Sequence, residues 1–438
     1  MRMMVVGLLV LLSGSVPATA RVLTLESTVA LALANNDDMR LADQDRLRAR
    51  EEIREGWSNA LPDIRVTSNY DRSFVLPTFV FDTPDGQQTF TIGTTNSVVS
   101  TVRLQQSLFS SGRIGAALKA ARAFRDFATQ GYALSRQTVS ARAEIAFYDA
   151  LLAESLVEVT NDALRLAAAN LTQVTSLKRA GRVSEYDLFR AEVQVAELRP
   201  DSIQSEKALE IAYTNLRDIV GVEQSEAVNL NGSFRSDTAL DLSSLAGVTK
   251  TGLDIRAEIH QANLEVRIRD AAIGAQKSEM RPSLDFVATA QLAVQSNDLS
   301  FSGDETQESW VTGLSLSIPL FDGMKNRALV NKTKVDKRKA EIRVDQLTKQ
   351  VRLEIRQAWF DLREAEQRVT AQEQIVTQAE KGERIARSRY GNGFGTQLEV
   401  MDAQLILSRS KSEFARAKRD RAVSLVMLER AVGMEIED

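Results

Sequence analysis

The chain has 438 residues, of which 43% are hydrophobic and 26% charged, an ordinary composition for a folded protein. It contains no cysteine and one histidine, His260, which excludes disulfides, thiolate nucleophiles and cysteine-ligated metals and leaves little room for acid–base chemistry. The 55 basic and 59 acidic residues give a net charge of −4, which argues against a surface that binds nucleic acid.

The first 20 residues have the pattern of a secretory signal peptide. Arg2 precedes an apolar run over residues 3–12, and residues 18–20, Ala-Thr-Ala, form a small-x-small cleavage signature. Ten apolar residues are too few to cross a bilayer, which needs about 20. We therefore expect cleavage near Ala20 and export of the mature chain.

Two long tracts without proline, residues 85–199 and 320–438, predict very long helices, because a helix interior excludes proline strongly. Apolar residues in both tracts follow the 3/4 spacing of a helix that packs lengthwise on its neighbours. We predict helices at about 37–60, 112–178, 184–220, 324–390 and 396–432. Pro200, inside the first returning helix, predicts a bend that the second returning helix lacks.

Four segments of alternating apolar and polar residues predict strands at about 62–74, 97–109, 282–293 and 309–320. Each has one apolar and one polar face and about the length that a tilted strand needs to cross a bilayer. The polar stretches 75–96 and 293–308 are expected to be the loops that join each pair of strands.

The chain is internally duplicated. A displacement of 212 residues superposes Phe109 on Phe321, Gly181 on Gly393, and Val220-Gly221 on Val432-Gly433. We therefore predict a first repeat over residues 21–221 and a second over 252–433, followed by a short tail at 434–438. Residues 222–251 connect the two repeats and are expected to form a collar at the middle of the helices.

The predicted strands cannot lie in a membrane as an open sheet, because the backbone groups at its edges would have no partners there. Three copies would supply twelve strands and twelve full-length helical columns. The expected fold is mainly α with a small β part, a trimeric 12-strand transmembrane β-barrel continued by a 12-helix α-barrel. Inward-facing polar residues fit a water-filled bore.

The sequence resembles the TolC family of outer-membrane export channels. The resemblance is carried by Leu23-Thr24-Leu25-Glu26, by residues 318–323 (Ile-Pro-Leu-Phe-Asp-Gly), and by Arg389-Tyr390 followed by Gly393 and Asp402-Ala403. It implies an outer-membrane barrel with a periplasmic helical extension. The absence of an N-terminal lipid-anchored cysteine places the chain nearer the unacylated members, which also serve type I secretion.

The turns at residues 181–184 and 393–396 connect the long helices to the returning ones. Glycine at a helix C-terminus first meets a conformational need, a positive φ. By resemblance, these turns are helical tips that dock on an adaptor. The tip residues are Gly181, Arg182, Val183, Ser184, Gly393, Phe394, Gly395 and Thr396.

Glu399 and Asp402 share one face of the second returning helix, because they are three residues apart. If that face lines the bore, three copies give two stacked acidic rings with six carboxylates in all, a cation-selective constriction that the resemblance places at the periplasmic aperture. The alternative is two acids favourably placed near a helix N-terminus. The resemblance also implies a gate hydrogen bond between Asp187 and Tyr390, and a second link missing at Gly395, where some relatives have arginine.

The sequence therefore predicts a passive outer-membrane duct of a tripartite export system, for drugs, small molecules or secreted protein. The expected partners are two further copies of the chain, a periplasmic adaptor, an inner-membrane transporter of ABC or RND type, and outer-membrane lipid. No catalytic residue, metal or cofactor is expected. A trimeric helical stalk with a structural or adhesive role is the alternative, and no motif supports a third reading, a soluble periplasmic enzyme.

Overall fold

The computed structural model describes residues 21–84, 86–238, 240, 242–298 and 306–434. The expected signal peptide and the tail after residue 434 lie outside these residues. The described chain forms two compact units. Unit 1 consists of residues up to 43, 132–257 and from 348 onward, and unit 2 of residues 44–131 and 258–347.

Eight helices in the described residues form two sets of four with identical lengths. The first set is α1 (Leu25–Asn35), α2 (Asp37–Ser58), α3 (Arg113–Arg179) and α4 (Glu185–Val220). The second set is α5 (Leu245–Ile255), α6 (Ala257–Ser278), α7 (Lys325–Gly391) and α8 (Gln397–Val432). The members have 11, 22, 67 and 36 residues in each set. The short helices α1 and α5, which the sequence analysis did not propose, are part of the duplication.

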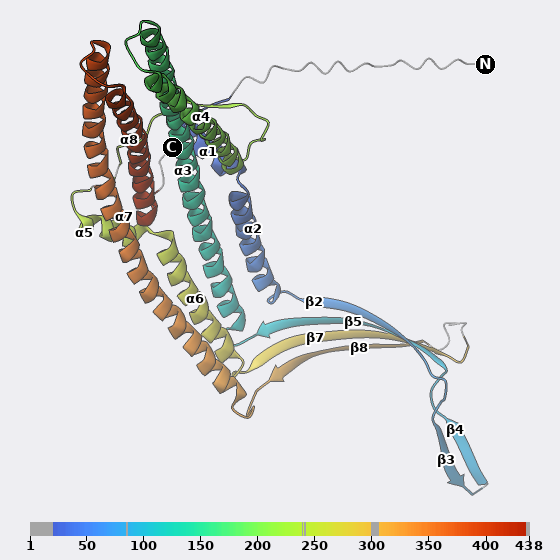
Figure 1. Cartoon of the computed structure of the whole chain (residues 1–438). Helices are drawn as coiled ribbons and strands as arrows, with labels where there is room; N and C mark the ends of the chain where they lie inside the picture. The colour runs from blue at the N-terminus through green and yellow to red at the C-terminus, as the bar shows by residue number, and fades with distance from the viewer. Residues whose placement is uncertain (1–20, 85, 239, 241, 299–305, 435–438) are drawn as a thin grey trace, which may run out of the picture. The chain divides into compact units, whose positions relative to one another are not determined.

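Unit 2 contains a four-stranded antiparallel sheet, in which the strands lie side by side (Figure 1). Its strands are β2 (Asp63–Arg72), β5 (Asn96–Phe109), β7 (Ser283–Ser296) and β8 (Thr306–Ser317), in the order β2-β5-β7-β8. β5 and β7, which come from different repeats, pair in the centre over most of their length. The two repeats are therefore joined by a shared sheet, with β2 and β8 at its edges.

The stretch 75–96 differs from the loop that the sequence analysis expected. It contains a hairpin of β3 (Thr78–Thr83) and β4 (Gly86–Thr91), in which Phe79 is paired with Phe90. The rings of Phe81 and Phe90 lie 5.9 Å apart in an edge-to-face arrangement. Alternating phenylalanines on either side of an Asp-Gly dipeptide in the sequence are a hairpin signal that the polar composition of this stretch obscured.

Unit 1 holds the connecting segment against the helices. β6 (Val228–Leu230) pairs in parallel with β1 (Arg21–Leu23), so the first described residues and the connecting segment form one small sheet. Beside it lies the largest core cluster of the unit. Its fully buried members include Leu23, Phe147, Tyr148, Leu216 and Val220.

Both returning helices end in the same way. Gly221 after α4 and Gly433 after α8 have φ of +71° and +89°, the left-handed conformation that favours glycine. A Cβ on Gly221 would lie 2.7 Å from Cβ of Asn35, at the end of α1, and one on Gly433 would lie 3.2 Å from Cα of Arg256, just after α5. Each repeat therefore packs the glycine cap of its long returning helix against the end of its short first helix.

α4 continues as a helix through Pro200.

Candidate functional site

The first helical turn, between α3 and α4, is built around a glycine and a capping box. Gly181 has a φ of +70°, and Ser184 is the N-cap of α4. The Asp187 carboxylate accepts hydrogen bonds from the backbone N–H of Ser184 at 3.0 Å and from its hydroxyl at 2.7 Å. The backbone N–H of Asp187 donates in return to the Ser184 hydroxyl at 3.1 Å. Asp187 therefore fixes the start of α4 within its own turn.

The second turn, between α7 and α8, is also built around a glycine and an N-cap residue. Gly393 has a φ of +82°, and Thr396 is the N-cap of α8, accepting a hydrogen bond from the backbone N–H of Glu399 at 3.3 Å. Glu399 and Asp187 thus occupy the same third position of their helices. Phe394 extends from this turn with 80% of its side chain exposed.

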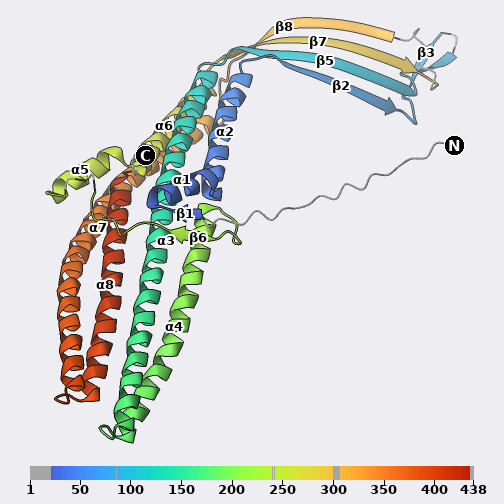
Figure 2. The same cartoon turned by 90° about the horizontal axis from the view of Figure 1, so that it is seen from above.

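An apolar cluster brings the two turns together at one end of unit 1. It contains Val174 of α3, Ala191 of α4, Tyr390 of α7 and Val400 of α8, all buried. Val183, in the first turn, packs against it. One residue from each of the four helices therefore contributes to a single core, which fixes the tip residues of both repeats in one place (Figure 2).

The structure brings Tyr390 near Asp187 but does not form the expected hydrogen bond between them. The Tyr390 hydroxyl is buried and has no hydrogen-bond partner among the described residues. Burial, with a smaller contribution from the negative charge of Asp187, raises the pKa of Tyr390 above its ordinary value. The carboxylate is already used in capping α4, a competing role that the Ser-x-x-Asp spacing of Ser184 and Asp187 indicates.

Gly395 has a steric role that the resemblance did not indicate. A Cβ at this position would lie 3.1 Å from both Cβ of Arg389 and the backbone nitrogen of Tyr390. A larger side chain would force the turn to shift. Glycine therefore fits at this position without a shift of the turn.

Glu399 and Asp402 are both exposed on the first turns of α8. Neither carboxylate forms an ion pair within the described part of the chain, whereas acids further along α8, such as Glu413 and Asp420, are paired with arginines. The two acids therefore form an unpaired negative patch next to the second turn. This arrangement is available to mobile cations in solution.

Sequence reasoning missed Gln397, the first residue of α8. Its side chain is only 3% exposed, and neither its amide nitrogen nor its amide oxygen has a hydrogen-bond partner in the described residues. The residue at the equivalent position of the first repeat, Glu185, is exposed. The exchange of a charged glutamate for a neutral glutamine between the two repeats is the one signal in the sequence that could have pointed to Gln397.

The two faces of the sheet in unit 2 differ in polarity. One row across all four strands is apolar and consists of Val66, Val102, Ala290 and Trp310. The next row, on the opposite face, consists of Thr67, Thr101, Gln291 and Ser309. On the apolar face Trp310 is 80% and Leu314 66% exposed, so a broad apolar surface is uncovered in the single chain.

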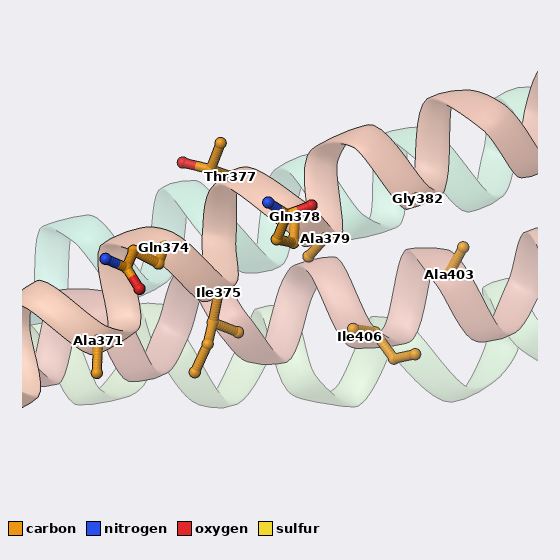
Figure 3. A pocket seen from close by; sticks show the side chains of 9 residues that line it. All are labelled: Ala371, Gln374, Ile375, Thr377, Gln378, Ala379, Gly382, Ala403 and Ile406. Carbon is orange, nitrogen blue, oxygen red and sulfur yellow. The ribbon is translucent and has the colours of Figure 1, made fainter.

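A shallow groove runs between α7 and α8 in unit 1 (Figure 3). Ile375 and Ile406 contribute apolar side chains from the two helices, and both are about half exposed. Gly382 and Ala403 contribute little side-chain volume. Small residues beside exposed isoleucines are a surface on which another helix can pack closely.

No described helix is both long and apolar enough to span a membrane.

Known proteins share this architecture. The sequence profile described as "Outer membrane efflux protein" matches residues 28–222 and 251–434. The Outer membrane protein TolC of Escherichia coli is 23% identical over 419 residues, covering 92% of this chain and 80% of TolC. The Proteases secretion protein PrtF of Dickeya chrysanthemi is 22% identical over 434 residues, covering 95% and 89%.

The crystal structure of the outer membrane protein VceC of Vibrio cholerae superposes with a TM-score of 0.74 at 19% identity, covering 94% of this chain and 97% of VceC. The match confirms the mainly α fold with a smaller β part. The family consists of channel proteins, which agrees with the prediction that the chain is not an enzyme. The chain belongs to the outer membrane efflux protein family.

Proposed function

We propose that the chain is one of three identical subunits of a passive export duct in the outer membrane. The single observation that carries this proposal is the sheet of unit 2. Among the described strands, β2 pairs only with β5 and β8 only with β7, so both edges are unpaired, and one face is apolar and exposed. Such a sheet is stable in lipid only when its edges are closed.

Closure follows from the strand directions. All neighbouring strands are antiparallel, and their number is even, so β8 of one copy can pair antiparallel with β2 of the next. Three copies would then form a barrel of twelve strands with the apolar row outside and the threonine and glutamine row inside. The same symmetry surrounds the bore with helices, and the exposed isoleucines of the α7–α8 groove would pack on a neighbouring copy.

The names of the relatives indicate the setting of this duct. PrtF is named for protease secretion, and other relatives are named solvent and cation efflux proteins. By analogy, we propose that an inner-membrane transporter, of ABC or RND type, and a periplasmic adaptor deliver drugs, small molecules or secreted protein to the duct. The exposed turns at residues 181–184 and 393–396 would dock the adaptor. Cleavage of a signal peptide near Ala20 would precede assembly.

The test is to purify the full-length protein in detergent, to measure the mass of the assembly, and to reconstitute it into planar bilayers. A duct requires three chains per particle and discrete single-channel currents. Particles of three chains that carry no current would support the helical stalk instead. A soluble monomer would contradict both.

We further propose that Tyr390 and Asp187 form the gate contact when the tips rearrange. Asp187→Ala should then raise single-channel conductance, because both the cap of α4 and the charge beside Tyr390 are lost. Ser184→Ala is the matched control, since it removes the capping hydroxyl but keeps the carboxylate. Loss of one cap costs about 1 kcal/mol of helix stability. Equal conductance changes in the two variants would show that fraying of the helix, and not a gate contact, is responsible.

A further inference from the structure

The connecting segment is fastened to two long helices of unit 1 through one arginine. Arg235 forms an ion pair with Glu429 of α8, and its Nη2 lies 3.9 Å from Oε2 of Glu144 on α3. Thr238, three residues further along the segment, donates a hydrogen bond of 2.7 Å to the other carboxylate oxygen of Glu429. The segment therefore joins α3 to α8 at this point.

Glu144 is not fully matched by its surroundings. Its side chain is 3% exposed, and its Oε2 has no hydrogen-bond partner in the described residues. The nearby charged or titratable groups are Arg235 of the segment, Glu429 and Arg430 of α8, and Tyr148 one turn further along α3. Tyr148 is itself fully buried. A single guanidinium thus serves two carboxylates, of which that of Glu144 is buried and that of Glu429 partly buried.

We propose that residues 231–238 form a latch that is closed when Glu144 carries a proton and opens when the proton is lost. With Glu144 neutral, the Arg235 guanidinium is paired with Glu429 alone. With Glu144 ionised, two carboxylates share this guanidinium, and the charge of Glu144 lies away from water. Lifting the segment hydrates that charge and releases Arg235 from both helices.

The segment packs on aromatic rings, and opening of the latch would have to break these contacts while water reaches the polar groups beside them. Gly232 and Phe234 lie against the aromatic rings of Phe147 and Tyr148, and the ring centres of Tyr148 and Phe234 are 6.0 Å apart. A small cavity lies beside Glu144 and Glu429 and is also lined by Gln137 and Ser140. These polar groups can receive water when the segment moves.

The direction of the pH effect follows from the surroundings of Glu144. Burial, with the charge of Glu429 adding and that of Arg235 opposing, raises the pKa of Glu144 to about 7. In the open latch the carboxyl is hydrated and has its ordinary, lower pKa. Between these two values the closed form holds a proton that the open form has lost, so closure is weakened as pH rises toward 7.

The test is hydrogen–deuterium exchange of the full-length protein in detergent at pH 5.5 and 8.5, corrected for the intrinsic exchange rate. Protection of the amides at residues 233–238 should be roughly tenfold or more lower at pH 8.5. Glu144→Gln should keep its pH 5.5 protection at both pH values. Glu158→Gln, which changes an exposed carboxylate on the same helix, should behave as the unaltered chain does.

Equal protection at the two pH values in the unaltered chain would overturn the proposal. The same pH response in Glu144→Gln would also overturn it, as would loss of the response in Glu158→Gln. If Glu144→Gln does not fold, the unaltered chain still decides, because its protection measured at intervening pH values must change most between the ordinary carboxyl pKa and pH 7. None of these outcomes depends on whether the protein conducts ions.

Discussion

Changing Glu399 to Gln and Asp402 to Asn together should strongly weaken block of the channel by multivalent cations. The two carboxylates are exposed, unpaired within the described chain and one turn apart, so three copies would present six negative charges around the bore. The amides keep the shapes of the side chains and remove only the charge. We expect the concentration of hexamminecobalt(III) that halves the single-channel current to rise at least about tenfold.

Glu413→Gln provides the control for this experiment. Glu413 lies on the same helix, but its carboxylate is already paired with Arg416 at 2.8 Å. Block by the cation should be unchanged in this variant. Undiminished block in the double amide variant would place the constriction elsewhere, and the two acids would then be only favourable neighbours of a helix N-terminus.

Truncation of Phe147 should cause a large loss of stability in unit 1. Its ring is fully buried and lies 6.0 Å from that of Tyr148 in an edge-to-face arrangement. We expect Phe147→Ala to lower the free energy of unfolding by about 3–5 kcal/mol, and Phe147→Leu by clearly less, because leucine leaves a smaller cavity. Denaturant titration followed by circular dichroism measures both.

The contact between Phe147 and the connecting segment can be tested by coupling. A Cβ on Gly232 would lie 3.0 Å from Cζ of Phe147, so Gly232→Ala should cost about 1–3 kcal/mol in the unaltered chain. The cost should fall in the Phe147→Leu background, where the ring atom is absent. Equal costs in the two backgrounds would show that the segment does not pack on this ring.

The long helices were predictable from the sequence because absence of proline and regular apolar spacing persist over many turns. The short helices α1 and α5 were missed, since 11 residues contain too few turns for a periodic pattern to stand out. The hairpin at residues 78–91 was missed because its phenylalanines alternate with polar residues inside a stretch of polar composition.

The candidate site was predictable only as positions along the chain. The duplication located both glycine turns, and helical spacing placed Glu399 and Asp402 on one face. Sequence spacing could not show that the Tyr390 hydroxyl is buried without a hydrogen-bond partner among the described residues. That fact depends on packing between segments about 200 residues apart. The contacts of Arg235 with Glu144 and Glu429 also join segments far apart in the sequence, so spacing alone could not show them.

The equal lengths of the paired helices restrict where this chain can gain or lose residues. Because α3 and α7 both have 67 residues and end in one shared cluster, removing seven residues from α3 alone would displace its turn by about 10 Å from the partner turn. The eight residues by which the repeats differ fall between their paired strands, in the stretch that holds the β3–β4 hairpin. Insertions and engineered fusions should therefore be tolerated at the strand connections. A change in the length of the long helices would have to be made in both repeats at once.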